Sequence, residues 1–255
     1  MRQRITIALL SLLLFVPAMA QKEEYNALKQ ATLMGLEYRV KAGFNIGGTS
    51  PLPLPREIRA INSYSPTLAI AIEGDVHKQF ENSRWGFLMG LRFETKGMKT
   101  NAWVKNYHME MTAKDGGYIE GAWTGRVKTK VRMSYVTIPM LATYKATPRL
   151  ELHAGPYFSY ATDREFSGSA IDGYIREGDA TGEKAYVEEA TYDFSDDIRN
   201  FQWGVQLGCE WRAYKHLNLY ADLSWGINSI FPNHFESVTF SMYPIYANLG
   251  FAYVF

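Results

Sequence analysis

A strict alternation of apolar and polar residues, sustained over about ten positions at a time, constrains this chain more than any other feature. It is clearest in the segments 36–46, 201–212 and 217–227. In the first of these segments, the apolar positions are Leu36, Tyr38, Val40, Ala42, Phe44 and Ile46. Side chains of a strand point alternately to opposite faces, so the alternation predicts strands with one apolar and one polar face.

Five further segments continue the pattern and bring the predicted antiparallel strands to eight. They are 67–76, 87–94, 135–145, 150–160 and 244–255. The apolar face of the clearest segments carries no charged residue. Tilted strands of roughly 9–11 residues cross a bilayer, and an arginine on the lipid face near the midplane would cost roughly 2–4 kcal/mol. The strands therefore have the length and the uncharged face that a membrane barrel requires.

The gaps between the predicted strands alternate in length. Three short gaps lie at 77–84, 146–148 and 213–216, and the long gaps lie at 47–66, 97–130, 162–198 and 228–243. Short turns that alternate with long loops are typical of outer-membrane barrels, with the turns in the periplasm. We therefore predict an all-β fold, an eight-stranded antiparallel transmembrane β-barrel with short periplasmic turns and long extracellular loops.

The first 20 residues predict an export signal. Arg2 and Arg4 precede a short apolar run, and Ala18 and Ala20 stand before Gln21. A basic start, an apolar centre and small residues at the end are typical of a cleaved signal peptide. No later segment is apolar for the roughly 20 residues that a spanning helix needs, so a crossing would have to be a closed barrel.

The predicted organisation follows from these two features. Residues 1–20 form the signal peptide, 21–34 an N-terminal periplasmic segment, and 35–255 the barrel domain, integral to the cell outer membrane. The last strand places aromatic and apolar residues two apart at the chain end. This spacing looks like the signal that the barrel-assembly machinery recognises, and its residues are Leu249, Phe251, Tyr253 and Phe255.

Composition narrows the function classes. The formal net charge of +1 gives no reason to expect nucleic acid as a partner. Aromatic residues make up 15% of the chain, which suits girdles at a membrane–water interface. The single cysteine, Cys209, excludes an intramolecular disulfide framework and a cysteine-rich metal site. No cofactor is expected.

The strand motifs resemble the PorT-like small outer-membrane β-barrels of the Bacteroidetes. The resemblance rests on the segments 38–45, 135–140, 154–157 and 249–255. It covers most of the mature chain and implies a barrel, but these motifs imply no shared chemistry. Some members of the family are associated with type IX secretion, so the resemblance also implies an unidentified secretion or surface partner.

Charges of both signs fall on the polar faces of the predicted strands and therefore in the predicted lumen. An eight-stranded barrel has an interior just wide enough for side chains to fill. We expect these charges to pair and to close the lumen, with a narrow gated channel as the alternative. The cluster consists of Glu37, Arg39, Lys41, Arg92, Glu94, Glu151, His153, Glu210, Arg212 and Asp222.

The two longest gaps carry opposite charge. The segment 97–132 is basic and 162–198 is acidic, so we expect the two loops to pair. The alternatives are a basic surface for lipopolysaccharide phosphates and an acidic one for cations, although the acids lack the spacing of a calcium loop. Four aromatic residues could form a surface contact or pack inside an extended hairpin: Trp103, Tyr107, Tyr118 and Trp123.

The sequence does not predict an enzyme. Hydrolase chemistry needs a nucleophile within hydrogen-bond reach of a base. Cys209 falls on the predicted lipid face, His77 and His216 in periplasmic turns, and His108 and His234 in outer loops. Neither outer histidine has a recognisable serine partner motif, so we expect a structural, surface-binding or secretion-accessory role, with lipid modification as the alternative. Outer-membrane lipid and lipopolysaccharide are the expected surroundings.

Overall fold

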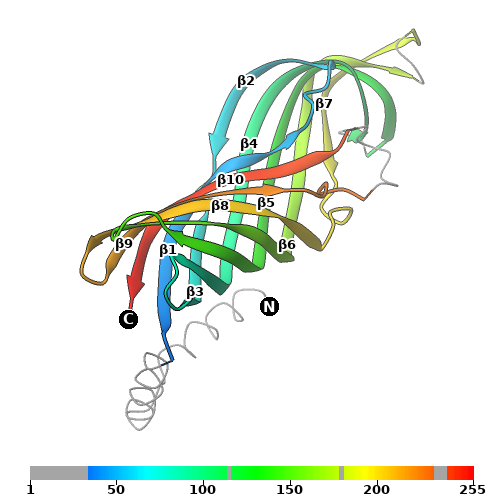
Figure 1. Ribbon diagram of the computed structural model, residues 1–255. Coiled ribbons are helices and arrows are strands. Elements are labelled where there is room, and N and C mark those ends of the chain that lie inside the picture. The colour runs from blue at the N-terminus through cyan, green and yellow to red at the C-terminus, as the bar shows by residue number, and fades with distance from the viewer. Residues whose placement is uncertain (1–33, 114–115, 178–180, 233–239) are drawn as a thin grey trace. The chain divides into compact units, whose positions relative to one another are not determined.

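The computed structural model describes residues 34–113, 116–177, 181–232 and 240–255 (Figure 1). The predicted signal peptide and nearly all of the segment 21–34 lie outside the described residues. Residues Tyr38–Phe255 form one compact unit, distinct from Met1–Glu37, and the fold below is that of the larger unit. Among the described residues, no helix reaches the length and hydropathy of a membrane span.

Ten strands make up the described part of the chain. Their bounds are β1 Leu36–Pro51, β2 Ile58–Pro66, β3 Ile70–Gln79, β4 Trp85–Ala113, β5 Tyr118–Lys145, β6 Leu150–Glu177, β7 Lys184–Asp193, β8 Phe201–Tyr214, β9 Leu217–Gly226 and β10 Met242–Val254. The turns after β3, β5 and β8 are short, as the spacing of the sequence predicts.

Eight of these strands close a ring. Going round it, β1 is followed by β10, β9, β8, β6, β5, β4 and β3, and β3 is hydrogen-bonded to β1 again. The first and last strands meet antiparallel, with Val40 opposite Tyr253 and Phe44 opposite Leu249. The eight-stranded antiparallel barrel predicted from the alternation is confirmed.

The other two strands lie beyond the ring. β2 pairs with β4 above the part that pairs with β3, and β7 pairs with β6 above the part that pairs with β8. Figure 1 shows β4, β5 and β6 continuing past the shorter strands β8, β9 and β10. We call this upper part the extension; it comprises β2, β7 and the described residues of 97–134 and 162–177.

The expectation of long loops at 97–130 and 162–198 is therefore wrong. These segments are mostly strand, because the alternation continues through them with its two faces exchanged. β4 and β5 pair from Trp85 opposite Tyr144 to Thr112 opposite Tyr118. The tip of β4 also pairs with β7, where Thr112 lies opposite Thr191. The extension is thus a continuation of the barrel wall.

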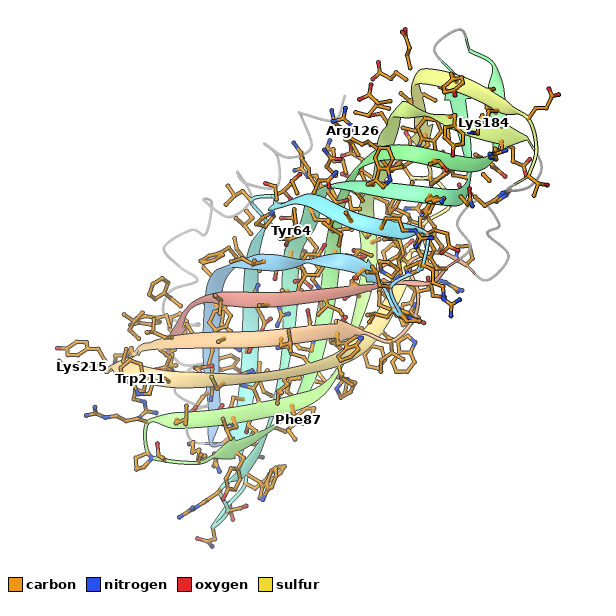
Figure 2. The ribbon with its side chains drawn as sticks, turned by 90° about the horizontal axis from the view of Figure 1, so that it is seen from above. Tyr64, Phe87, Arg126, Lys184, Trp211 and Lys215 are labelled. Carbon is orange, nitrogen blue, oxygen red and sulfur yellow. The ribbon has the colours of Figure 1, made fainter. Side chains whose placement is uncertain are left out.

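Within the ring, the outer face is apolar and the lumen is polar. On β4, Phe87, Met89 and Leu91 are exposed on the outside, whereas Arg92 and Glu94 are buried inside. Figure 2 shows the side chains of Phe87 and Trp211, which stand on the strands of the ring. A barrel in lipid needs this arrangement, because the hydrocarbon disfavours any charge on its outer face.

Within the extension, the two faces are exchanged. Buried apolar side chains form one core inside it, with Met98 and Val104 from β4, Trp123 and Val131 from β5, and Phe166 from β6. The outward positions beside them are mainly polar, with the exposed Trp103 as an exception. The extension is therefore built like a water-soluble sheet that buries one apolar face.

The hydroxyl of Tyr192 is buried in this core, away from water. Burial raises the pKa of its hydroxyl well above the ordinary value, against the lowering effect of its hydrogen bond with Thr129. The Tyr192 Oη lies 2.7 Å from Thr129 Oγ1 and donates to the Lys128 carbonyl at 3.0 Å. A neutral tyrosine thus ties β7 to β5 across β6.

Candidate functional site in the barrel lumen

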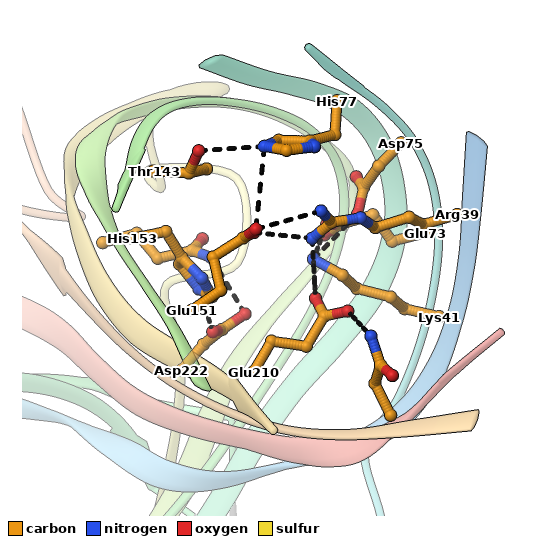
Figure 3. A network of polar contacts seen from close by, with 12 residues as sticks. Arg39, Lys41, Glu73, Asp75, His77, Thr143, Glu151, His153, Glu210 and Asp222 are labelled. Carbon is orange, nitrogen blue, oxygen red and sulfur yellow. Dashed lines mark hydrogen bonds and ion pairs between the residues drawn. The ribbon is translucent and has the colours of Figure 1, made fainter. Parts of the chain in front are cut away.

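The lumen of the ring holds a continuous network of ion pairs and hydrogen bonds (Figure 3). Its charged side chains come from β1, β3, β4, β6, β8 and β9, and each occupies an inward position of the alternation. All of them are buried. The same period of two that puts apolar residues on the outer face delivers these charges to one interior space.

Arg39 anchors the end of the network nearest the short turns. Its guanidinium makes two contacts with Glu151, Nη1 to Oε1 at 2.7 Å and Nη2 to Oε2 at 3.2 Å. The same Nη1 lies 3.2 Å from Glu210 Oε2. Asn218 donates to the other oxygen of Glu210 at 2.5 Å. This paired geometry favours arginine, because two parallel N–H groups match a carboxylate.

Lys41 and Arg92 share the next set of carboxylates. The Lys41 Nζ lies 2.7 Å from Asp75 Oδ2 and 3.3 Å from Glu73 Oε1. Arg92 binds the second oxygen of Glu73 through Nε, and its Nη2 lies 3.7 Å from Asp222 Oδ2. Glu73 therefore bridges the two cations, and the contact between Arg92 and Asp222 crosses the lumen from β4 to β9.

The upper end of the network is a lysine surrounded by tyrosine rings. Lys96 Nζ lies 3.0 Å from Glu94 Oε1. It also lies 5.4–5.7 Å from the ring centres of Tyr135, Tyr157 and Tyr246. A cation over several aromatic faces is attracted by each of them. These rings separate the polar lumen from the apolar core of the extension.

Two histidines complete the network. His153 Nε2 lies 2.6 Å from Asp222 Oδ1, and Gln206 donates to the other oxygen of Asp222 at 2.9 Å. His77 Nε2 lies 2.9 Å from Thr143 Oγ1 and 3.7 Å from Glu151 Oε2. A base that activates a hydroxyl normally uses one ring nitrogen for the nucleophile and the other for the acid. At His77 both groups approach the same nitrogen.

Charges of both signs meet in the network, with two more carboxylates than cations among the residues that follow. Four cations face six carboxylates, with the two histidines beside them. The cations are Arg39, Lys41, Arg92 and Lys96, and the carboxylates are Glu73, Asp75, Glu94, Glu151, Glu210 and Asp222. Lys41 is only 1% exposed although it is charged, which shows how fully the neighbouring side chains fill the lumen. Buried charged side chains therefore occupy the lumen of the ring.

The structure places eight of the ten predicted lumen residues in this network. Glu37 lies half-buried near the start of β1, and Arg212 is exposed near the end of β8, where the strand has passed the ring. Assigning Arg212 to the cluster is therefore wrong. Lys96 was missed because the predicted strand ended at Glu94, although it continues the spacing of Arg92 and Glu94.

His77 corrects a second expectation. It was expected in a periplasmic turn, but β3 runs on to Gln79 and His77 is completely buried in the lumen. Its place in the sequence, two residues after Asp75, extends the inward series on that strand. His216 lies in the turn between β8 and β9, as expected, where its Nδ1 is 2.8 Å from the Val254 carbonyl oxygen.

The four aromatic residues of the basic segment divide between surface and core. Trp123 is completely buried, and Tyr107 packs against Phe240 with ring centres 5.6 Å apart. A surface role for these two is therefore wrong, and the packing alternative holds for them. Trp103 is exposed. The side chain of Tyr118 lies outside the described residues.

The remaining predicted residues also have places in the fold. Phe251, Tyr253 and Phe255 are exposed on one face at the chain end, next to half-buried Leu249. His108 lies in β4, not in a loop, with its Nε2 3.5 Å from Glu120 Oε1. His234 lies outside the described residues.

A polar groove of about 800 Å³ lies on the extension. Two rows of paired residues cross it from β2 to β7. The first row is Ser63, Asn101, Lys128, Ser169 and Thr191, and the second is Ser65, Lys99, Lys130, Ser167 and Asp193. The groove is therefore rich in hydroxyl and ammonium groups.

Two lysines of this groove stand directly opposite each other, Lys99 on β4 and Lys130 on β5. Like charges at such positions repel. Lys130 is neutralised by Glu165 at 2.5 Å, whereas Lys99 and Lys128 form no ion pair within the described part of the chain. Arg126, farther along β5, pairs with Asp172. The expected pairing of the basic and acidic segments thus accounts for only some of the cations.

Comparison with known proteins gives a family and a set of similar folds. The family model described as "Outer membrane protein beta-barrel domain" matches residues 19–232. A comparison with curated proteins finds no match. Among solved structures, the attachment invasion locus protein Ail of Yersinia pestis is 8% identical and has a TM-score of 0.35; the match covers 86% of this chain and 97% of that one.

Two more solved structures are similar to the same degree. Neisserial surface protein A is 9% identical with a TM-score of 0.28, and the match covers 87% of this chain and 97% of that one. The outer membrane protease OmpT of Escherichia coli is 12% identical with a TM-score of 0.33, over 87% of this chain and 94% of that one.

Proposed function

The chain belongs to the outer membrane protein β-barrel domain family and is an outer-membrane protein, and from this premise we propose that it is a non-enzymatic, closed barrel whose extension binds anionic saccharide at the cell surface. In this proposal residues 1–20 direct export and are removed. The short turns face the periplasm, and the extension faces outward.

The cations Lys99 and Lys128 carry the proposal. They lie side by side with Lys130 on the outer face of the extension, in a groove lined by serine and threonine hydroxyls. Phosphate oxygens accept hydrogen bonds from both ammonium and hydroxyl groups. Lys99 in the groove lies six positions beyond Phe93, an exposed apolar residue on the outer face of β4. We therefore expect the groove to lie near the sugar phosphates of lipopolysaccharide.

A binding measurement tests this function. We expect purified protein in detergent to bind phosphorylated lipopolysaccharide, and the double variant K99Q/K128Q to bind at least ten-fold more weakly. K105Q/K215Q removes two exposed lysines outside the groove and is the matched control. Equal affinity of all three proteins, or equal binding of dephosphorylated lipopolysaccharide, would refute the proposal.

The lumen network supports the closed state. We expect no stable conductance from the wild-type barrel in a planar bilayer, because buried side chains fill the ring. A narrow gated channel is the alternative. Steady single-channel currents from the wild-type protein, altered by K41M, would favour it.

The absence of enzymatic activity is likewise a proposal. His77, His108 and His153 are the histidines that the structure places in strands, and each lies near a carboxylate. At His77 the Thr143 hydroxyl and the Glu151 carboxylate approach the same ring nitrogen, which does not suit a base that activates a hydroxyl. Hydrolysis or acyl transfer on lipid A or phospholipid by the purified protein, lost in H108A, would reverse it.

A secretion-accessory role is the finer form of the same proposal. It rests on the resemblance of segments such as 38–45 and 135–140 to PorT-like barrels of the Bacteroidetes. If the chain serves type IX secretion, its deletion leaves secreted cargo in the periplasm. Normal secretion by the deletion strain would leave the surface-binding role alone.

A further inference from the structure

A second, apolar cavity of about 440 Å³ lies where the ring meets the extension. Its lining differs from that of the polar groove, because most of its side chains are aliphatic or aromatic. Met98, Val104 and Val127 line it from β4 and β5, and Phe166 and Met242 from β6 and β10. These five side chains also belong to the core of the extension.

An open space of this size is unusual inside a protein. Interiors are close-packed and leave few voids larger than a water molecule. Pockets that enclose small ligands have volumes of roughly 300–1,000 Å³ and combine apolar walls with a few polar groups. Here the polar groups are hydroxyls, from Thr49, Thr100, Thr129 and Tyr64. The cavity therefore matches a site for a mainly apolar ligand.

The wall beside the cavity is not closed by strand pairing. β3 ends its contact with β1 near Asn45, whose N–H donates to the Ala69 carbonyl at 2.7 Å. β2, which continues above β3, is hydrogen-bonded to β4 and to no other described strand. One side-chain bond spans the gap, from Tyr64 Oη to the Gly47 carbonyl at 2.6 Å. Figure 2 shows Tyr64 on the side of β2 that faces β1.

Gly48 lets two side chains pack against the backbone of β1 beside this gap. A Cβ atom added at Gly48 would lie 2.8 Å from Met98 Sδ and 3.7 Å from Tyr64 Cε2. The flexible end of the Met98 side chain therefore lies at the inner end of the gap, and a side chain at Gly48 would displace it. On the outside, apolar side chains rim the same gap: Ile61 is 57% exposed, and Leu54 is exposed as well, although both also line the cavity.

The gap begins where the apolar outer face of the ring ends. On β1 the exposed series of Val40, Phe44 and Ile46 stops just before Gly47. In the segment between β2 and β3, Leu68 is 91% exposed, and it directly precedes Ala69, whose carbonyl marks the start of the gap. The opening therefore meets the edge of the lipid layer, and its source of ligand is the adjacent membrane leaflet.

We propose that this cavity binds the chain of a single-chain amphiphile, which enters sideways from the membrane between β1 and β2. The apolar chain lies against Met98, Val104 and Phe166, and its polar end meets the hydroxyls at the mouth. One chain fits the volume, whereas a lipid with several chains does not. Thr100 and Thr129 line both this cavity and the polar groove, so the two sites adjoin, but the proposal does not rest on the ligand of the groove.

Native mass spectrometry of the full barrel in detergent tests the site, with palmitic acid as the probe. We expect wild-type protein to retain one palmitate. A102F places a ring in the cavity and is expected to reduce the bound fraction at least five-fold. A60F makes the same change on the outward face of β2 and is expected to bind like wild type.

Folding is checked in each variant by the mobility shift between unboiled and boiled samples. No retained palmitate in the wild type, or equal retention in A102F and A60F when both are folded, would overturn the proposal. Retention lost in A102F alone supports it.

The sideways path has its own test. Y64A removes the side chain that spans the gap together with its bond to Gly47. We expect palmitate to dissociate several-fold faster from Y64A than from wild type. An unchanged dissociation rate would refute access between β1 and β2.

Discussion

The two halves of β4 share one alternation of inward and outward side chains, but the types of residue on the two faces are opposite. From Trp85 to Lys96 the outward side chains are mainly apolar and the inward ones include buried charges, whereas from Met98 onward the inward side chains are mainly apolar. The strand does not shift its register against β5 at this point. Only the residue types are exchanged, because the solvent on the outside changes from lipid to water.

The exchange shows what each region relies on for stability. The ring gains little from burying apolar surface against itself, since its apolar face is turned to lipid, and its interior is held by paired charges. The extension gains from a conventional apolar core. The two regions should therefore respond in opposite ways to the same kind of substitution.

The largest effect is expected in the lumen. R39M leaves Glu151 and Glu210 without their shared cation, and breaking a buried ion pair in this way costs about 3–5 kcal/mol. Unfolding by urea from lipid vesicles measures the loss. R212M is the matched control, because Arg212 is exposed and its loss should change stability by no more than about 0.5 kcal/mol. Equal losses would show that the network does not stabilise the ring.

A similar loss, confined to the extension, is expected for W123A. Trp123 is completely buried in the extension core, and removing such a ring costs about 3–5 kcal/mol. Limited proteolysis should cut the extension faster while the ring keeps its heat-dependent mobility shift. W103A is the matched control, because Trp103 is an exposed tryptophan of the same extension, and it should leave the cleavage rate nearly unchanged. If the ring lost its mobility shift as well, the two regions would not be separable.

An arginine placed on the outer face of the ring or of the extension tests whether lipid surrounds one and water the other, and an intermediate loss of stability is expected in the ring. M89R puts a cation on the outer face in the middle of the apolar part of β4, at a cost of about 2–4 kcal/mol. A60R introduces the same side chain at an exposed, outward position of β2 in the extension, where water solvates it, and should cost almost nothing. Folding free energies in vesicles compare the two variants. Comparable costs would place the lipid boundary above Ala60.

The smallest effect is expected for the exposed ion pair of the extension. Arg126 and Asp172 are 43% and 60% exposed at their side chains, and pairs of this kind contribute roughly 0–1 kcal/mol. R126Q should therefore lower the stability of the extension only slightly, and 1 M salt should remove the difference. A salt-independent loss above that range would show that the pair has a structural role.

The ring could be predicted from sequence because one rule governs it throughout. Each segment has an uncharged outer face and charged or small inner residues, so the pattern alone fixes which of Arg39, Lys41 and Arg92 turn inward. The strands of the extension could not be predicted by the same rule. Its apolar positions, such as Met98 and Val104, fall on the opposite phase, and a change of phase looks like the end of a strand.

Parts of the site could not have been derived from the pattern at all. That β2 pairs only with β4 depends on how the wall is built beyond β3, which no local alternation records. The contacts of Lys96 with Tyr135, Tyr157 and Tyr246 bring together four strands, β4, β5, β6 and β10. Such contacts depend on the closure of the ring and on the angle at which its strands cross it.

The length of the central strands has a mechanical consequence. β4 runs for 29 residues, and β5 and β6 for 28 each. At a rise of about 3.3 Å per residue, each strand measures roughly 90–95 Å along its path, about three times the hydrocarbon thickness of a bilayer. A pull on the tip is shared along these ladders as shear, so many hydrogen bonds carry the load together. A force applied to the tip of the extension would therefore be transmitted along these strands to the ring in the membrane, with little stretching of the extension itself.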